Sequence, residues 1–191
     1  MNDLSGRTPW QQITKRIRVP LGFLFAGIYF WFARPNEQSL LLSLILVVPG
    51  IALRAYASGY VKKNAELTVT GPYAYTRNPL YLGSMMIAFG FAAAARNLWI
   101  TLALVVLFGT IYLPTILGEE TYLITHFLEF DEYARSVPRL LPRVSPWVRQ
   151  GETRGASQFS LALYSKHREY NSVLGSTILF LALIARMLWR H

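Results

Sequence analysis

Cysteine is absent from this chain of 191 residues, and histidine occurs only 3 times. A chain without thiols has no disulfide framework, no thiolate nucleophile and no thiolate metal site. The histidines, His126, His167 and His191, lack the short spacings typical of metal ligands, so we expect no dedicated metal centre. Any chemistry of this protein therefore uses an organic cofactor or no cofactor.

Charged residues are also scarce. They make up 15% of the chain, against roughly 25% in an average soluble domain, whereas 53% of the residues are hydrophobic. A net charge of +9 could indicate nucleic-acid binding, but the basic residues cluster beside long apolar runs, as juxtamembrane charges do. We therefore expect an integral membrane protein that contacts membrane lipids and has no nucleic-acid partner.

Five apolar runs are long enough, or nearly so, to cross a hydrocarbon core about 30 Å thick. They cover residues 17–33, 39–60, 79–95, 98–117 and 173–189. Very short connections at 34–38 and 96–97 predict two antiparallel hairpins. The predicted fold is all-α and polytopic, with about five transmembrane helices.

The predicted organisation has three parts. Residues 1–142 form a core with four spans, 143–172 form a cytoplasmic linker and amphipathic segment, and 173–191 form the fifth span. Between Glu119 and Val137 apolar residues recur near the helical period, which predicts one helix lying in the membrane interface.

The basic residues also predict an orientation. Fifteen of the 19 Lys and Arg residues lie in alternate segments, namely residues 1–18, 54–77 and 118–172. By the positive-inside rule these segments face the cytoplasm. We therefore expect a cytoplasmic N-terminus and a site that opens on the cytoplasm.

One candidate site lies in residues 66–83, which lead into the third span. Gly71-Pro72 is a turn signal, and Asn78 and Pro79 suit the start of a helix, so a capped helix with interfacial tyrosines would explain the pattern. A functional interpretation is also open. A helix N-terminus offers N–H groups to an anion, Gly83 permits close approach, and tyrosine rings can stack on a base.

Two further features involve charges near the membrane. Glu119 and Glu120 follow the fourth span directly, where acidic groups are unfavourable for the helix dipole unless a cation is near. They are either a solvated pair or ligands for a cation. Arg54 interrupts the second span, and it either extends its head to the interface or points inward to hold a carboxylate or phosphate.

Taken in order, these motifs resemble the membrane methyltransferases related to isoprenylcysteine carboxyl methyltransferase and phosphatidylethanolamine N-methyltransferase. The resemblance covers residues 45–142 and rests on five elements separated by a membrane hairpin. They are Gly71-Pro72-Tyr73, Arg77-Asn78-Pro79-Leu80-Tyr81-Leu82-Gly83, Glu119-Glu120, Phe130-Asp131-Glu132-Tyr133 and Val137-Pro138-Arg139-Leu140-Leu141-Pro142.

The resemblance implies methyl transfer from S-adenosylmethionine to a lipid-like acceptor at the cytoplasmic face. The positions that match the family's cofactor site are Glu66, Leu67, Val69, Tyr73, Asn78, Pro79, Leu80, Tyr81, Glu119 and Glu120. The catalytic residue stays open, with Arg54, Arg77 and Glu120 as candidates. Methyl transfer to a heteroatom needs mainly alignment and exclusion of water, and no metal.

The chain departs from the family pattern in three places. Asn78 replaces the frequent histidine, Ile116 stands where prenylcysteine enzymes have a substrate-contacting arginine, and residues 143–191 lie outside the resemblance. An amine lipid, a prenylated thiol or carboxylate, and a polyprenyl or quinone-like molecule are all open as acceptors. Two other functions are weighed: an NADPH-dependent membrane reductase of the sterol type, and a non-enzymatic adaptor that holds anionic lipid.

Overall fold

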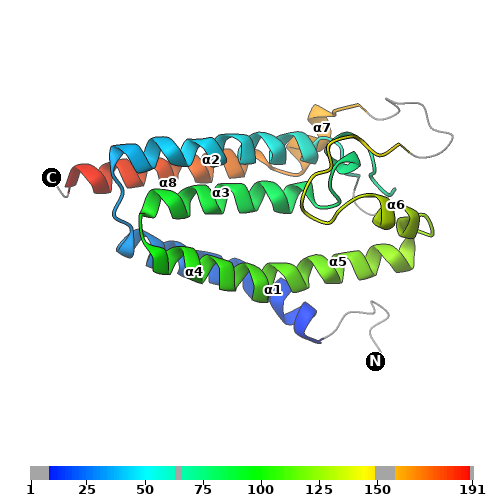
Figure 1. Ribbon diagram of the computed structural model, residues 1–191, viewed down its shortest axis with the longest axis horizontal. Coiled ribbons are helices and arrows are strands. Elements are labelled where there is room, and N and C mark those ends of the chain that lie inside the picture. The colour runs from blue at the N-terminus through cyan, green and yellow to red at the C-terminus, as the bar shows by residue number, and fades with distance from the viewer. Residues whose placement is uncertain (1–8, 63–65, 149–157, 190–191) are drawn as a thin grey trace.

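The computed structural model describes residues 9–62, 66–148 and 158–189, and every regular element in these ranges is helical (Figure 1). The long helices are α1 (Pro9–Phe32), α2 (Glu37–Ser58), α3 (Pro79–Ala95), α4 (Leu98–Leu107), α5 (Leu113–His126) and α8 (Tyr170–Trp189). The short elements are η1 (Gly71–Ala74), the π-turn η2 (Phe108–Tyr112), α6 (Phe130–Ser136) and α7 (Leu161–Lys166).

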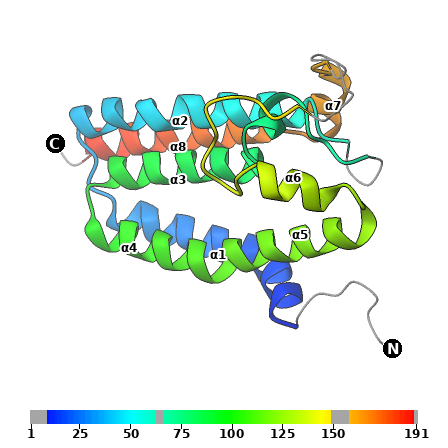
Figure 2. The ribbon, with the colours of Figure 1, turned by 45° about the vertical axis from the view of Figure 1, so that its right-hand side comes forward.

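The helices run roughly parallel to one long axis. In both ribbon views α3 lies between the pair α2 and α8 on one side and the α4–α5 helix on the other (Figures 1 and 2). The connections α1–α2 and α3–α4 lie at one end, whereas α6, α7 and the loops beside them gather at the opposite end. The polar segments with the sequence motifs therefore meet at one end of the bundle.

The predicted all-α, polytopic membrane fold is confirmed. Within the described ranges, three helices are long and apolar enough to cross a membrane: Glu37–Ser58, Leu98–His126 and Tyr170–Trp189. The first and third predicted spans are also helical, but their apolar parts, Gly22–Phe32 and Pro79–Ala95, are shorter. Large apolar side chains on the outer faces, such as Leu41, Trp99 and Ile178, are exposed, as expected where lipid surrounds a protein.

Glycines allow α2 and α3 to pack closely. A Cβ atom on Gly50 would lie 2.9 Å from the carbonyl oxygen of Gly83, and one on Gly90 would lie 2.7 Å from a methyl group of Val47. Small residues at such crossings let two backbones approach, which is how helices gain van der Waals contact in a membrane. The first turn of α3 is thereby held against the C-terminal half of α2.

The fourth span differs from its prediction. The helix does not end near residue 117 but continues through the π-turn and α5 to His126, so Glu119 and Glu120 lie inside a helix and not at its C-terminus. A π-turn directly before Pro114 accommodates the missing N–H of the proline. The argument from the helix dipole for these two glutamates was therefore wrong.

The predicted interfacial helix over residues 119–137 was also wrong. It is divided between the end of α5 and the separate helix α6, with Phe127 extended between them. Because of this break, the side chains of Phe130 and Tyr133 are buried in a cluster with Val137. Leu67 and Val69 pack against this cluster. Burial of these aromatic rings is the physical reason for two helices in place of one.

The C-terminal segment is attached to the core by specific contacts. Ser160 N–H donates to the carbonyl oxygen of Gly59 at 3.0 Å, and Phe159 stacks on Tyr56 with ring centroids 6.1 Å apart. α7 and α8 both contact α2. The division into a core, a segment 143–172 and a fifth span stays a prediction, and residues 149–157 of it lie outside the described ranges.

We expect Gly50→Ala to destabilise the protein by about 1–3 kcal/mol, because the added methyl group meets backbone atoms of α3 that cannot move independently. Gly27→Ala is the matched control, since nothing lies within 4 Å of its Cβ position and alanine favours a helix. Thermal unfolding in a mild detergent measures both. Equal unfolding temperatures for the two variants would contradict the close α2–α3 contact.

Candidate functional site

The motif residues meet at the end of the bundle where α5 leaves the predicted membrane region. The segment around η1 is joined to the loop after α6 by three backbone hydrogen bonds of 2.9 Å: Arg77 N–H to Pro138, Arg143 N–H to Tyr75, and Trp147 N–H to Ala74. The buried Thr76 hydroxyl adds bonds to the carbonyl oxygens of Arg139 and Leu140. Two parts of the chain about 60 residues apart thus form one unit.

Glu120 is the centre of this unit. It is only 6% exposed, and its carboxylate accepts hydrogen bonds from Asn78 Nδ2 at 3.2 Å and from Arg139 Nε and Nη2 at 3.0 and 2.9 Å. Arg77 Nη1 lies 3.5 Å away as a second cation. The hydrogen bond to Glu120 raises the pKa of Arg139 above its ordinary value.

Asn78 does not cap α3, as the simpler interpretation of the sequence would require. Its side chain makes no capping hydrogen bond and instead donates to Glu120 and, at 3.1 Å, to the carbonyl oxygen of Arg139. The N–H groups at the start of α3 are therefore not covered by the side chain that usually satisfies them. A helix N-terminus of this kind is suited to an anion.

Arg77 carries a buried donor with nothing to bind. Its Nε has no hydrogen-bond partner among the described residues, although its side chain is only 13% exposed. Two guanidinium groups surround the single carboxylate of Glu120, so these groups alone leave a surplus of one positive charge. An unsatisfied buried donor costs about 1–3 kcal/mol, which an anionic ligand at this point would recover.

Glu119 lies beside Glu120 in α5 and has a different partner. It is half-buried and accepts a hydrogen bond from the Tyr81 hydroxyl at 3.1 Å. The Tyr81 ring makes an edge contact with Tyr112, with centroids 6.3 Å apart. The site therefore contains a second carboxylate next to aromatic faces.

The remaining predicted cofactor residues occupy three environments. Tyr73 is buried in a cluster with Ala57 and Tyr60, and burial raises the pKa of its hydroxyl. Leu67 and Val69 line the Phe130–Tyr133–Val137 cluster, and Pro79 is fully buried at the start of α3. Glu66 pairs at the surface with Lys62 Nζ at 2.8 Å, and no described contact connects it with Glu120.

Arg54 points inward and does not extend its head to the interface. It forms a bidentate ion pair with Glu169, with Nη2 2.8 Å from Oε2 and Nε 3.1 Å from the same oxygen. Its Nη1 donates to Ser84 and to the carbonyl oxygen of Leu80. No described contact joins Arg54 or Glu169 to Glu120, so Arg54 is not part of the Glu120 cluster.

Sequence reasoning missed two residues of this site. Arg139 was part of a recognised motif but had no assigned role, although a buried glutamate requires a cation and Arg139 lies between the two prolines of that motif. Tyr133 donates from its hydroxyl to the carbonyl oxygen of Tyr73 at 2.7 Å, a contact that no spacing along the chain indicates. Burial raises the pKa of this hydroxyl too.

Comparison with known proteins identifies the family. Residues 37–129 match the family model of the phospholipid methyltransferases. The chain is also 31% identical over 158 residues to a cobalt-zinc-cadmium resistance protein of Cupriavidus metallidurans. The matched region covers 79% of this chain and 70% of that protein. The chain belongs to the phospholipid methyltransferase family. The resemblance derived from the motifs is thereby confirmed, and the protein is a membrane methyltransferase by family.

Other relatives of this methyltransferase are matched over a shorter length. A nickel-cobalt-cadmium resistance protein of Alcaligenes xylosoxydans xylosoxydans is 37% identical over 90 residues, which are 47% of this chain and 41% of that protein. The protein-S-isoprenylcysteine O-methyltransferase of Schizosaccharomyces pombe is 28% identical over 125 residues, 65% of this chain and 48% of that enzyme. The chain thus spans less than half of these two relatives. No solved structure matches the chain significantly.

We expect Tyr133→Phe to destabilise the methyltransferase by about 1–3 kcal/mol, because the carbonyl oxygen of Tyr73 would stay buried without its donor. Tyr75→Phe removes the hydroxyl of a more exposed tyrosine in the same segment and serves as the control. Thermal unfolding of the purified proteins compares them. If the two variants unfold at the same temperature, the Tyr133 hydroxyl does not fasten α6 to η1.

Proposed function

We propose that this methyltransferase transfers a methyl group from S-adenosylmethionine to a lipid-like acceptor at the cytoplasmic face of a membrane. The observation that carries the proposal is the Glu120 cluster, where one buried carboxylate, two arginines and the uncapped start of α3 lie together. The cytoplasmic orientation is part of the proposal and rests on the distribution of the basic residues.

The donor set of the cluster fits the chemical groups of this cofactor. Arg77 Nε and the N–H groups at the start of α3 are suited to its carboxylate, and the half-buried Glu119 is suited to its ammonium group. Tyr81 and the apolar side chains of Leu67, Val69 and Leu80 offer surfaces for the adenosine part. Glu120 acts in this arrangement by holding Arg77, Arg139 and Asn78 in place.

S-adenosylmethionine supplies an electrophilic methyl group when bound, so the chain must supply alignment and a site without water. A cavity of about 400 Å³ lies among α1, α3, α4, η2 and α8, and Tyr112 is in its wall. Because Tyr112 also contacts Tyr81, the cavity adjoins the residues that surround Glu119. An apolar chain in this cavity would bring its reactive end to the polar cluster, which supports a lipid-like acceptor.

The first test is the choice of cofactor. We expect S-adenosylmethionine or its demethylated product to bind the detergent-solubilised protein in calorimetry, and NADPH not to bind. The physical reason is that the half-buried carboxylate of Glu119 is suited to a cationic group, which S-adenosylmethionine carries and NADPH lacks. Binding of NADPH without binding of S-adenosylmethionine would support a membrane reductase instead, and binding of neither would leave the adaptor function.

The second test concerns Glu120. We expect Glu120→Gln to weaken binding of S-adenosylmethionine ten- to a hundredfold, because the charge that orders Arg77 and Arg139 is lost, and a charged hydrogen bond contributes about 1.5–3 kcal/mol. Glu129→Gln removes the same charge from an exposed position nearby and should bind like the unmodified protein. Calorimetry on folded protein gives both constants, and equal values would remove Glu120 from the site.

A further inference from the structure

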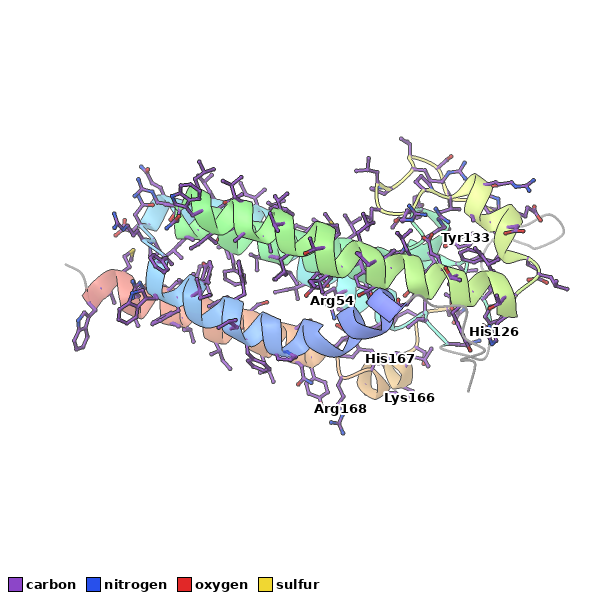
Figure 3. The ribbon with its side chains drawn as sticks, turned by 90° about the horizontal axis from the view of Figure 1, so that it is seen from below. Arg54, His126, Tyr133, Lys166, His167 and Arg168 are labelled. Carbon is purple, nitrogen blue, oxygen red and sulfur yellow. The ribbon has the colours of Figure 1, made fainter. Side chains whose placement is uncertain are left out.

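The cavity in the membrane region has one charged residue and a partner for it. Among the described residues that line the cavity, Arg54 alone is charged, and the others are mostly apolar or carry hydroxyl groups. Figure 3 shows Arg54 among the helices, whereas Arg168, next to Glu169, points away from the bundle. Glu169 itself points inward, and its side chain is only 12% exposed. Arg54 therefore lines the cavity, and the mostly buried Glu169 is bound to it.

Glu169 uses most of the binding capacity of Arg54. Nε and Nη2 donate to its two carboxylate oxygens at 2.8 to 3.1 Å, while Nη1 is taken by Ser84 and the carbonyl oxygen of Leu80. All three guanidinium nitrogens are thus bound within the protein. An anionic headgroup in the cavity would find no available cation and would lie next to a buried carboxylate, which is unfavourable in a medium of low dielectric constant.

The turn between α7 and α8 directs Glu169 to this place. Arg168 has a φ of +53°, a conformation that residues other than glycine adopt rarely, and it separates the exposed Lys166 from the inward Glu169. Residues 130–191 lie beyond the part of the chain that matches the family model. The counter-charge of Arg54 is therefore supplied by the C-terminal segment and not by the family core.

The size of the cavity restricts what it holds. About 400 Å³ is near the lower end for sites of small organic ligands, so it takes one apolar chain and not two. Gly22 of α1 and Gly175 of α8 line it, and a Cβ atom on either would meet nothing within 4 Å. Ser172 also lines the cavity; its hydroxyl donates to the carbonyl oxygen of Glu169 and keeps acceptor capacity for a neutral polar headgroup.

We propose that Glu169 determines headgroup selectivity: by neutralising Arg54 it makes the cavity accept single-chain lipids with an uncharged polar headgroup and reject anionic ones. The inference rests on the proposed function only where it identifies this lipid as the methyl acceptor. The acceptor class is then a neutral single-chain alcohol: its hydroxyl oxygen would form the bond to the methyl group as the sulfonium S–CH3 bond breaks, and the hydroxyl proton would pass to water.

Competition binding tests the proposal without any methyl transfer. The protein in a neutral detergent is incubated with tritiated oleyl alcohol, and unlabelled oleyl alcohol or oleyl phosphate is added as a competitor for the same site. The two competitors have the same chain, but only the phosphate is anionic. We expect oleyl alcohol to compete better with the unmodified protein. In Glu169→Gln the guanidinium of Arg54 becomes available to the phosphate, and we expect the preference to move about tenfold or more towards oleyl phosphate.

Three variants make the result specific. Glu132→Gln removes an exposed carboxylate from α6 and should keep the preference of the unmodified protein. Arg54→Gln combined with Glu169→Gln removes both charges and should gain no affinity for oleyl phosphate, which separates released charge from damaged structure. Gly175→Leu should weaken binding of both lipids, whereas Gly27→Leu, whose site has equally open space outside the cavity, should not.

The proposal is overturned if the folded Glu169→Gln variant keeps the lipid preference of the unmodified protein. It is also overturned if the unmodified protein prefers oleyl phosphate, or if it shows no saturable binding of oleyl alcohol. The cofactor measurement distinguishes these results from failure of the proposed function. Binding of S-adenosylmethionine without lipid selectivity removes only the inference about Glu169. The expected lipid selectivity without cofactor binding supports that inference and removes the methyl-transfer proposal.

Discussion

The arrangement of the polar end of the protein depends on burial of the Glu120 carboxylate. A carboxylate that is only 6% exposed requires compensation, and its partners come from the start of α3, from Arg77 and from the loop that follows α6. These partners lie 19 to 43 residues away along the chain. Satisfying one charge therefore draws three segments together, and the backbone hydrogen bonds between η1 and residues 138–147 follow from that closeness.

Much of the fold was predictable because membrane helices are determined by local composition. The third span, 79–95, has the bounds of α3, and the site motifs were recognised in their correct order. The end of the fourth helix was not predictable, since its last turns are polar and are held by the contacts of Glu119 and Glu120 with α3 and not by lipid. The same holds for α6, whose separation from α5 depends on the burial of Phe130 and Tyr133.

The partners of the charged residues were the part of the structure least predictable from the sequence. Hydrophobic periodicity indicates which face of a helix is buried, but it does not indicate which ion meets which across the fold. Arg54 illustrates the limit, because the sequence predicts that an arginine inside a span needs the interface or an anion, and the anion is Glu169, 115 residues away. Arg139 is a similar case: its motif was recognised, but its role depends on where α5 ends.

Residues at the start of α3 take part in two electrostatic environments. Asn78 and Tyr81 contact the glutamates of α5, whereas Leu80 and Ser84 contact Arg54, and Gly83 lets α2 approach. The first environment has a buried donor with no partner among the described residues, whereas in the second Arg54 is paired with Glu169. A charged cofactor and an uncharged chain would each find the environment that solvates it. Tyr112, which contacts Tyr81 and lines the cavity, is the point at which the two environments adjoin.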